Sequence, residues 1–138
     1  MSKICIFGGT TEGRKLAEFL SGQPCDVTVC VATDYGQTLL PESEHVSVSA
    51  RRLPVGEIVS LLTEKRFDLV IDATHPYAQS ITKSIASACR ETGTPRWRLL
   101  RSASGRACFP CSRPWMRARR QGSRLRTFLR CRARFLRP

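Results

Sequence analysis

A glycine-rich segment near the N-terminus could bind a phosphate group. Its residues are Gly8, Gly9, Thr10, Thr11, Glu12 and Gly13. The segment follows an apolar run at residues 3–7 and precedes apolar residues at helical spacing, so we expect a strand, a tight turn and a helix. In such a turn, glycines let the backbone approach phosphates, and N–H groups at the helix start and threonine hydroxyls donate hydrogen bonds. The pattern departs from G-x-G-x-x-G, because Thr10 replaces the second glycine, and a tight connection without a ligand is nearly as good an interpretation.

A second candidate follows the next apolar run, about 20 residues beyond the glycine turn, where dinucleotide-binding folds contact the adenosine ribose. Asp34 at this point would suit NAD. The Thr33 hydroxyl, with Arg51 and Arg52 after the third expected strand, could instead bind the 2′-phosphate of NADP. Alternatively, Asp34 is a turn cap and the arginines are solvated. The residues alone leave the choice of cofactor open.

A third candidate is the segment Asp72–Ala78, which leaves the most apolar expected strand, residues 68–73. Ligands of open α/β sheets bind at this carboxyl edge. Pro76 suits the first turn of a helix, so we expect Thr74 or His75 at the helix cap. The partial positive charge of that helix N-terminus would then face a cleft.

His75 and Tyr77 are the candidate catalytic residues of this third segment. Either side chain could orient an anionic substrate or deliver a proton. In the alternative interpretation, Asp72 makes structural hydrogen bonds in the loop, His75 only caps the helix, and Tyr77 packs.

Strand-like and helix-like segments alternate up to residue 100. Strands are expected at residues 3–7, 26–32, 46–49, 68–73 and 97–100, and helices around residues 16–20, 55–62 and 81–89. Such alternation implies parallel strands joined by right-handed crossovers. The predicted class is therefore α/β, a Rossmann-like parallel sheet with helices on both faces.

The net charge of +12 comes from one end of the chain. Residues 1–100 hold 11 basic and 11 acidic side chains, whereas residues 101–138 hold twelve arginines with neither lysine nor acid. We expect a lobe at residues 1–101 and a disordered basic tail at residues 102–138, which is either a genuine arm or the product of a wrong reading frame. The tail could bind phosphate backbones only nonspecifically, since it contains no nucleic-acid motif.

The composition also predicts the compartment. No stretch approaches the roughly 20 apolar residues of a membrane span, and the N-terminus lacks the features of a secretory signal. The seven cysteines are irregularly spaced, and no His accompanies the C-x-x-C of Cys108 and Cys111, so we expect reduced thiols and no metal site. A cytoplasmic protein without membrane contact is predicted.

Three segments together resemble the precorrin-6A reductase family of cobalamin biosynthesis, including its cobalt-precorrin-6A branch. They are KICIFGGTTEGRKLAEFL, VATDYGQTLLP, and VIDATHPYAQSITKSIASAC leading into TGTPRWRLLR. The resemblance covers residues 1–101, and the combination of GGTTEGR with DATHPYA is specific. Arg96 stands where the family has an aromatic residue, and nothing after Arg101 matches.

The resemblance implies an NADPH-dependent reductase with two Rossmann-like lobes that reduces one double bond of a polycarboxylate corrinoid precursor. It implies that the glycine turn, Thr33, Arg52 and Thr74 bind the cofactor and that His75 or Tyr77 orients the substrate or delivers the proton. A missing second lobe would remove half of the cleft, and the chain could then be inactive. Oligomeric state and the presence of cobalt in the substrate stay open.

Other classes of protein also fit part of the pattern. A non-catalytic dinucleotide-binding module would share the glycine turn. An extended short-chain dehydrogenase would need a lysine four residues after Tyr77, where this chain has Ile81. A specific nucleic-acid binder is disfavoured by the neutrality of residues 1–100.

Overall fold

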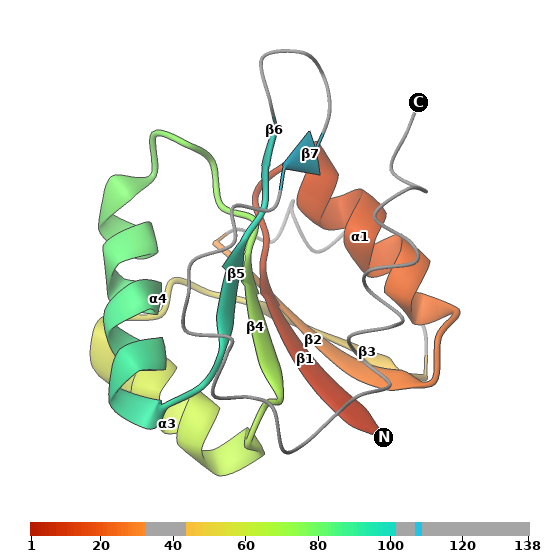
Figure 1. Ribbon diagram of the computed structural model, residues 1–138, viewed down its shortest axis with the longest axis horizontal. Coiled ribbons are helices and arrows are strands. Elements are labelled where there is room, and N and C mark those ends of the chain that lie inside the picture. The colour runs from red at the N-terminus through yellow and green to blue at the C-terminus, as the bar shows by residue number, and fades with distance from the viewer. Residues whose placement is uncertain (33–43, 102–106, 109–138) are drawn as a thin grey trace.

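The computed structural model describes residues 1–32, 44–101 and 107–108, and within them the chain forms one parallel sheet covered on both faces. The strands are β1 (Ser2–Phe7), β2 (Cys25–Val31), β3 (Val46–Ala50), β4 (Leu69–Asp72) and β5 (Arg96–Arg98). The helices are α1 (Thr11–Ser21), α3 (Val55–Lys65) and α4 (Gln79–Thr92). The sheet order is β3-β2-β1-β4-β5, with α1 on one face and α3 and α4 on the other (Figure 1). The predicted Rossmann-like α/β class is confirmed.

The burial of both faces explains the continuous apolar strands. Along β1, Ile4 and Ile6 pack toward α1, whereas Cys5 and Phe7 pack toward α3 and α4. Successive side chains of a strand point to opposite faces, so a strand covered on both sides must be apolar at every position.

The register brings the candidate segments to one edge of the sheet. Phe7 pairs with Cys30 on one side and with Asp72 on the other. Beyond these pairs, the Gly8 N–H donates to the Cys30 carbonyl at 2.8 Å and the Ala73 N–H donates to the Phe7 carbonyl at 2.9 Å. The glycine turn and the segment after β4 therefore leave the sheet side by side.

The start of α4 differs from the prediction. The helix begins at Gln79 with Ala78 as its N-cap, and not at Thr74 or His75. The Ala78 N–H donates to the His75 carbonyl at 2.9 Å, so these residues form a β-turn with Pro76 at its second position. The fixed φ of proline suits that position as well as it suits a first helical turn, and here the turn prevails.

The chain after β5 is only partly described. β5 ends at Arg98, two residues before the predicted end, and the short strand β6 (Leu100–Arg101) pairs antiparallel with β7 (Ala107–Cys108). Leu100 belongs to the predicted last strand, whereas β7 lies where no regular structure was expected. The rest of the basic tail, and Thr33 and Asp34, lie outside the described residues, so the domain boundary at residue 101 stays a prediction. In the described ranges, no helix is long and apolar enough to cross a membrane.

Candidate functional site

The glycine turn joins β1 to α1 through a backbone conformation that favours glycine. Gly9 has a φ of +133°, it is exposed, and a Cβ built on it would meet no atom within 4 Å. Thr10 caps α1 by accepting a hydrogen bond from the Gly13 N–H at 3.2 Å. The first turn of a helix leaves N–H groups without intrahelical acceptors, among them that of Thr11. The turn thus offers an open backbone and a helix N-terminus, as a phosphate group requires.

The other two glycines of the turn are needed because the backbone is closely packed. A Cβ on Gly8 would lie 3.1 Å from Cγ1 of Val31, and a Cβ on Gly13 would lie 2.9 Å from Cβ of Ala73. The helix therefore approaches the end of β4 as closely as a glycine allows. This contact sets the position of the α1 N-terminus on the sheet.

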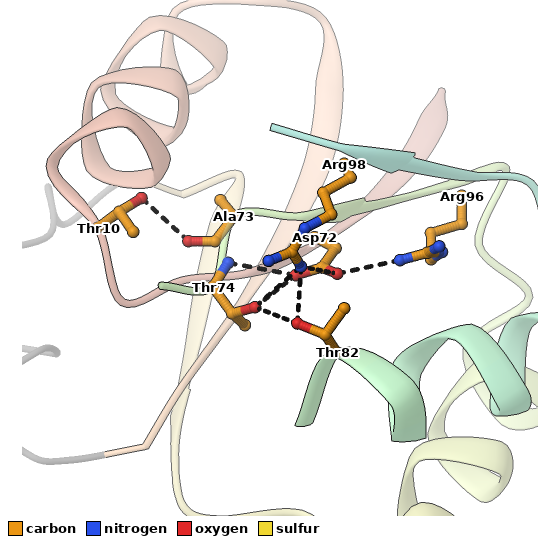
Figure 2. Close-up of polar contacts among 7 residues, drawn as sticks. All are labelled: Thr10, Asp72, Ala73, Thr74, Thr82, Arg96 and Arg98. Carbon is orange, nitrogen blue, oxygen red and sulfur yellow. Dashed lines mark hydrogen bonds and ion pairs between the residues drawn. The ribbon is translucent and has the colours of Figure 1, made fainter. Parts of the chain in front are cut away.

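The Thr10 hydroxyl connects the glycine turn to the segment after β4. It accepts from the Gly13 N–H. It also donates to the carbonyl of Ala73 at 2.9 Å (Figure 2). The sequence analysis expected this hydroxyl to donate to phosphate, but its one proton is used inside the protein. Its contribution to the site is to hold two segments together.

Asp72 lies at the centre of a polar network at the carboxyl end of β4 (Figure 2). Its side chain is fully buried, with 0% exposure. Oδ1 accepts from the Thr74 N–H at 3.2 Å and from the Thr74 hydroxyl at 2.7 Å, and Oδ2 accepts from Arg96 at 3.0 Å and from Arg98 at 2.5 Å. A buried carboxylate needs such pairing to offset its desolvation. The structural role considered for Asp72 is therefore observed.

The same network binds the hydroxyl of Thr74. Besides donating to Asp72, this oxygen lies 3.1 Å from the Thr82 hydroxyl on α4 and 3.3 Å from Nη1 of Arg98. Thr74 is buried, so a role of its hydroxyl in cofactor binding stays a prediction that these internal bonds do not favour.

His75 and Tyr77 form an exposed pair on the turn before α4. The Tyr77 side chain is 87% exposed, and its ring centroid lies 5.2 Å from that of His75. The Tyr77 N–H donates to Nδ1 of His75 at 3.3 Å. Because that nitrogen accepts, the neutral imidazole carries its proton on Nε2. Tyr77 is not packed in the core, and both side chains are open to a ligand.

The two arginines after β3 have different surroundings. Arg51 forms an ion pair with Glu57, with 3.2 Å between Nη2 and Oε2. Arg52 is exposed and has no ion-pair partner within the described ranges. Arg52 is therefore the more available of the two for an anion.

Sequence reasoning missed Arg98 and Thr82 as members of the site. Arg98 pairs with Asp72 across β4 and β5, and the Thr82 hydroxyl, in the first turn of α4, accepts from Nη1 of Arg98. The sequence did contain a signal. Arg96 and Arg98, separated by one residue, lie on one face of a short strand that follows an apolar strand. The network becomes visible only when the register of β5 is known.

The described thiols are core groups. Cys5, Cys25, Cys30 and Cys89 are free and buried. A hydrogen bond with Cys30, together with burial, raises the pKa of Cys5 well above its usual value, and the same bond lowers the pKa of Cys30. Burial raises the pKa of Cys89 to about 11. Among the described residues, no group of three or more His, Cys, Asp or Glu could hold a metal ion.

The parallel sheet, with a glycine turn at its carboxyl edge and a helix directly after it, defines a Rossmann-like α/β protein. The chain belongs to the Precorrin-6x reductase CbiJ/CobK family, whose sequence model matches residues 3–125. This match extends beyond Arg101, where the sequence analysis placed the end of the resemblance.

Curated relatives agree with this family. The chain is 34% identical to the cobalt-precorrin-6A reductase of Salmonella typhimurium over 90 residues, which are 65% of this chain and 34% of the relative. It is 33% identical to that of Methanothermobacter thermautotrophicus over 92 residues, which are 66% of this chain and 30% of the relative. The chain thus spans about a third of the length of these relatives.

The structure resembles that of CobK precorrin-6A reductase with a TM-score of 0.64 and 28% identity, covering 74% of this chain and 38% of that one. It also resembles the oxidoreductase ylbE from Lactococcus lactis, with a TM-score of 0.52 and 18% identity over 68% of this chain and 45% of that one. The second likeness concerns the fold alone.

Proposed function

We propose that this chain takes part in the reduction of one ring double bond of precorrin-6A or cobalt-precorrin-6A, in cobalamin biosynthesis, with NADPH as the reductant. Family membership supports the reaction class. The observation that carries the proposal is the hydrogen bond between Thr10 and Ala73, which joins the glycine turn to the segment that bears His75 and Tyr77. Cofactor contacts and proton-delivering side chains would then share one edge of the sheet.

The glycine turn fits the pyrophosphate of a dinucleotide. The space beside Gly9 is open, and the N–H of Thr11 has no intrahelical acceptor. The backbone can approach a phosphate closely at the glycines of the turn, Gly8, Gly9 and Gly13. The helix begins directly after the turn, with Thr11 and Glu12 as its first residues. Thr33 and Arg52 would bind the 2′-phosphate, which distinguishes NADPH from NADH.

A reduced nicotinamide, when bound, supplies a hydride to one carbon of the ring double bond. The neighbouring carbon needs a proton, and His75 or Tyr77 is the proposed donor. The Nε2–H of His75 and the Tyr77 hydroxyl are both available, since the described bonds of this pair involve only Nδ1 and the backbone. Arginines and helix N-termini would hold the carboxylates of the substrate.

The test has two steps on the full 138-residue chain. The first measures binding of NADPH and NADH by cofactor fluorescence, for the wild type and for Gly9→Val, which cannot readily adopt a φ of +133°. Binding of NADPH that Gly9→Val abolishes would support the nucleotide site. The second step supplies precorrin-6A or cobalt-precorrin-6A and follows oxidation of NADPH. Binding without oxidation would favour a non-catalytic module, and no binding would overturn the proposal.

A further inference from the structure

Arg98 contacts three residues that belong to different parts of the site. Its Nη1 lies 2.5 Å from Oδ2 of Asp72, 2.7 Å from the Thr82 hydroxyl and 3.3 Å from the Thr74 hydroxyl. Asp72 and Thr74 come from the end of β4, and Thr82 comes from the first turn of α4. Arg96 binds the same carboxylate but has no described bond to either threonine.

The hydrogen bonds of this network run in one direction. A carboxylate only accepts, so the Thr74 hydroxyl donates its hydrogen bond to Asp72. The Thr82 hydroxyl then donates to the Thr74 oxygen, and the Thr82 oxygen accepts from Arg98. Each hydroxyl proton thus has one position, and removal of Arg98, Thr82 or Thr74 leaves a donor or an acceptor unpaired.

Within the described residues, the turn formed by residues 75–78 is held only at its two ends. His75, Pro76 and Tyr77 are exposed. The described bonds of the turn connect its own residues, Gln79 and, through the Ala78 carbonyl, the backbone N–H of Thr82 at 3.2 Å. Its position must therefore be set by Thr74 before it and by the first turn of α4 after it. Arg98 binds both of these ends.

We propose that Arg98, acting through Thr82 and Thr74, is the positioning residue for the turn that carries His75 and Tyr77. Its importance for reduction of the corrinoid ring rests on the proposed function, but its effect on the turn does not. The Ala73 carbonyl that binds Thr10 is held by the β4 ladder, through the bond from Ala73 to Phe7. Loss of Arg98 should therefore disturb the His75 turn and leave the glycine turn in place.

The test compares Arg98→Met with Arg96→Met. Each variant removes one positive charge that is paired with the Asp72 carboxylate. Thr82→Val removes one hydroxyl without a change in shape or charge. Thr82→Ser is the control, because it keeps the hydroxyl. Two quantities are measured by NMR on the full chain without cofactor: the exchange rate of the Ala78 amide and the ¹⁵N shifts of the His75 ring. His45, the only other histidine, serves as the internal control.

Arg98→Met and Thr82→Val should each speed exchange of the Ala78 amide by about five- to tenfold, the effect of one lost, partly buried hydrogen bond. They should also shift the His75 ring away from the tautomer with the proton on Nε2. Arg96→Met and Thr82→Ser should resemble the wild type, as should the amides of β1 in every variant.

An unchanged Ala78 amide and His75 ring in Thr82→Val would overturn the proposal, as would equal changes in Arg96→Met and Arg98→Met. If Arg98→Met does not fold, the two Thr82 variants decide. In the reductase assay, Arg98→Met should lower kcat while the affinity for NADPH stays within about twofold, because the glycine turn is untouched. A wild-type chain that binds no NADPH would refute the proposed function and leave the NMR comparison valid.

Discussion

Glycines at three positions of this chain differ in backbone conformation or in what an added methyl group would meet. Gly9 needs its positive φ, whereas Gly13 needs the space that a Cβ would take from Ala73. Gly56, in the first turn of α3, has neither requirement, because nothing lies within 4 Å of its Cβ position. Gly9 and Gly13 therefore have two separate structural requirements and Gly56 has neither, so substitution should have a different effect at each position.

Gly13→Ala should lower the free energy of unfolding by about 1–3 kcal/mol, because its Cβ would overlap Ala73. Gly56→Ala, also in a helix, should raise it by about 0.5–1 kcal/mol, because alanine loses less backbone entropy. Urea unfolding of both variants and of the wild type measures these two changes in the free energy of unfolding. Equal effects at the two positions would mean that the contact with Ala73 relaxes at little cost.

Arg52 provides a second prediction at the scale of single residues. Arg52→Gln should weaken binding of NADPH about five- to tenfold, because one charge-assisted bond to the 2′-phosphate is lost. The affinity for NADH should not change. Arg51→Gln is the matched control, since Arg51 is paired with Glu57. An equal loss of affinity for NADPH and NADH in Arg52→Gln would count against a 2′-phosphate contact. Tighter binding of NADH than of NADPH by the wild type would favour Asp34 as the ribose ligand.

Among the helices, α4 connects the sheet to the candidate site through two different parts of its length. Its first turn carries Thr82, which binds the network around Asp72. Its middle carries Ile85, Ala88 and Cys89, which pack in the core with α3 and the sheet. The core contacts hold the helix, and the polar contacts at its start hold the turn before it.

The buried thiol of α4 predicts a dependence of stability on pH. Burial raises the pKa of Cys89 from 9.0 to about 11. In the range between these values the unfolded chain loses the proton and the folded chain retains it, so stability falls as the pH rises. Relative to Cys89→Ala, the wild type should lose about 1 kcal/mol of unfolding free energy at a pH of about 10.

Thermal or urea unfolding at several pH values measures this difference between the two proteins. Below a pH of about 8 the difference should be constant, because the Cys89 thiol is then protonated in both the folded and the unfolded chain. A constant difference up to the highest pH would show that the Cys89 thiol ionises as it does in the unfolded chain.

At the scale of the whole molecule, the positive charge is concentrated at one end of the chain. Residues 1–100, in which basic and acidic side chains are equal in number, contain every strand of the parallel sheet. The family match nevertheless continues to residue 125, into the arginine-rich part. Deletion of that part is therefore a direct test of its contribution to the fold.

We expect deletion of residues 102–138 to leave the melting temperature and the affinity for NADPH nearly unchanged. Arginines without acidic partners are costly to bury, and the few aliphatic residues of this segment cannot offset roughly 1–2 kcal/mol of backbone ordering per residue. Calorimetry and cofactor titration of the deleted and full chains provide the comparison. A large loss of either property would make the segment part of the fold and would refute the reading-frame interpretation.

Much of the fold could be predicted because burial on both faces of the sheet leaves a local pattern. The runs in β1, β2 and β4 are apolar at nearly every position, and the helices between them have one apolar face. The carboxyl-edge location of Gly9 and Thr74 followed from the same alternation. These features depend on neighbours in sequence, so the sequence by itself determined them.

The start of α4 and the network around Asp72 were decided by tertiary structure. Pro76 is equally compatible with a helix and a turn, and the bonds from Thr74 to Asp72 favour the turn. Arg98 meets Asp72 only because β5 pairs with β4 in one register, and Thr82 meets both only because α4 crosses that pair. Contacts between residues 8 to 26 positions apart depend on strand register and helix packing, which no local pattern encodes.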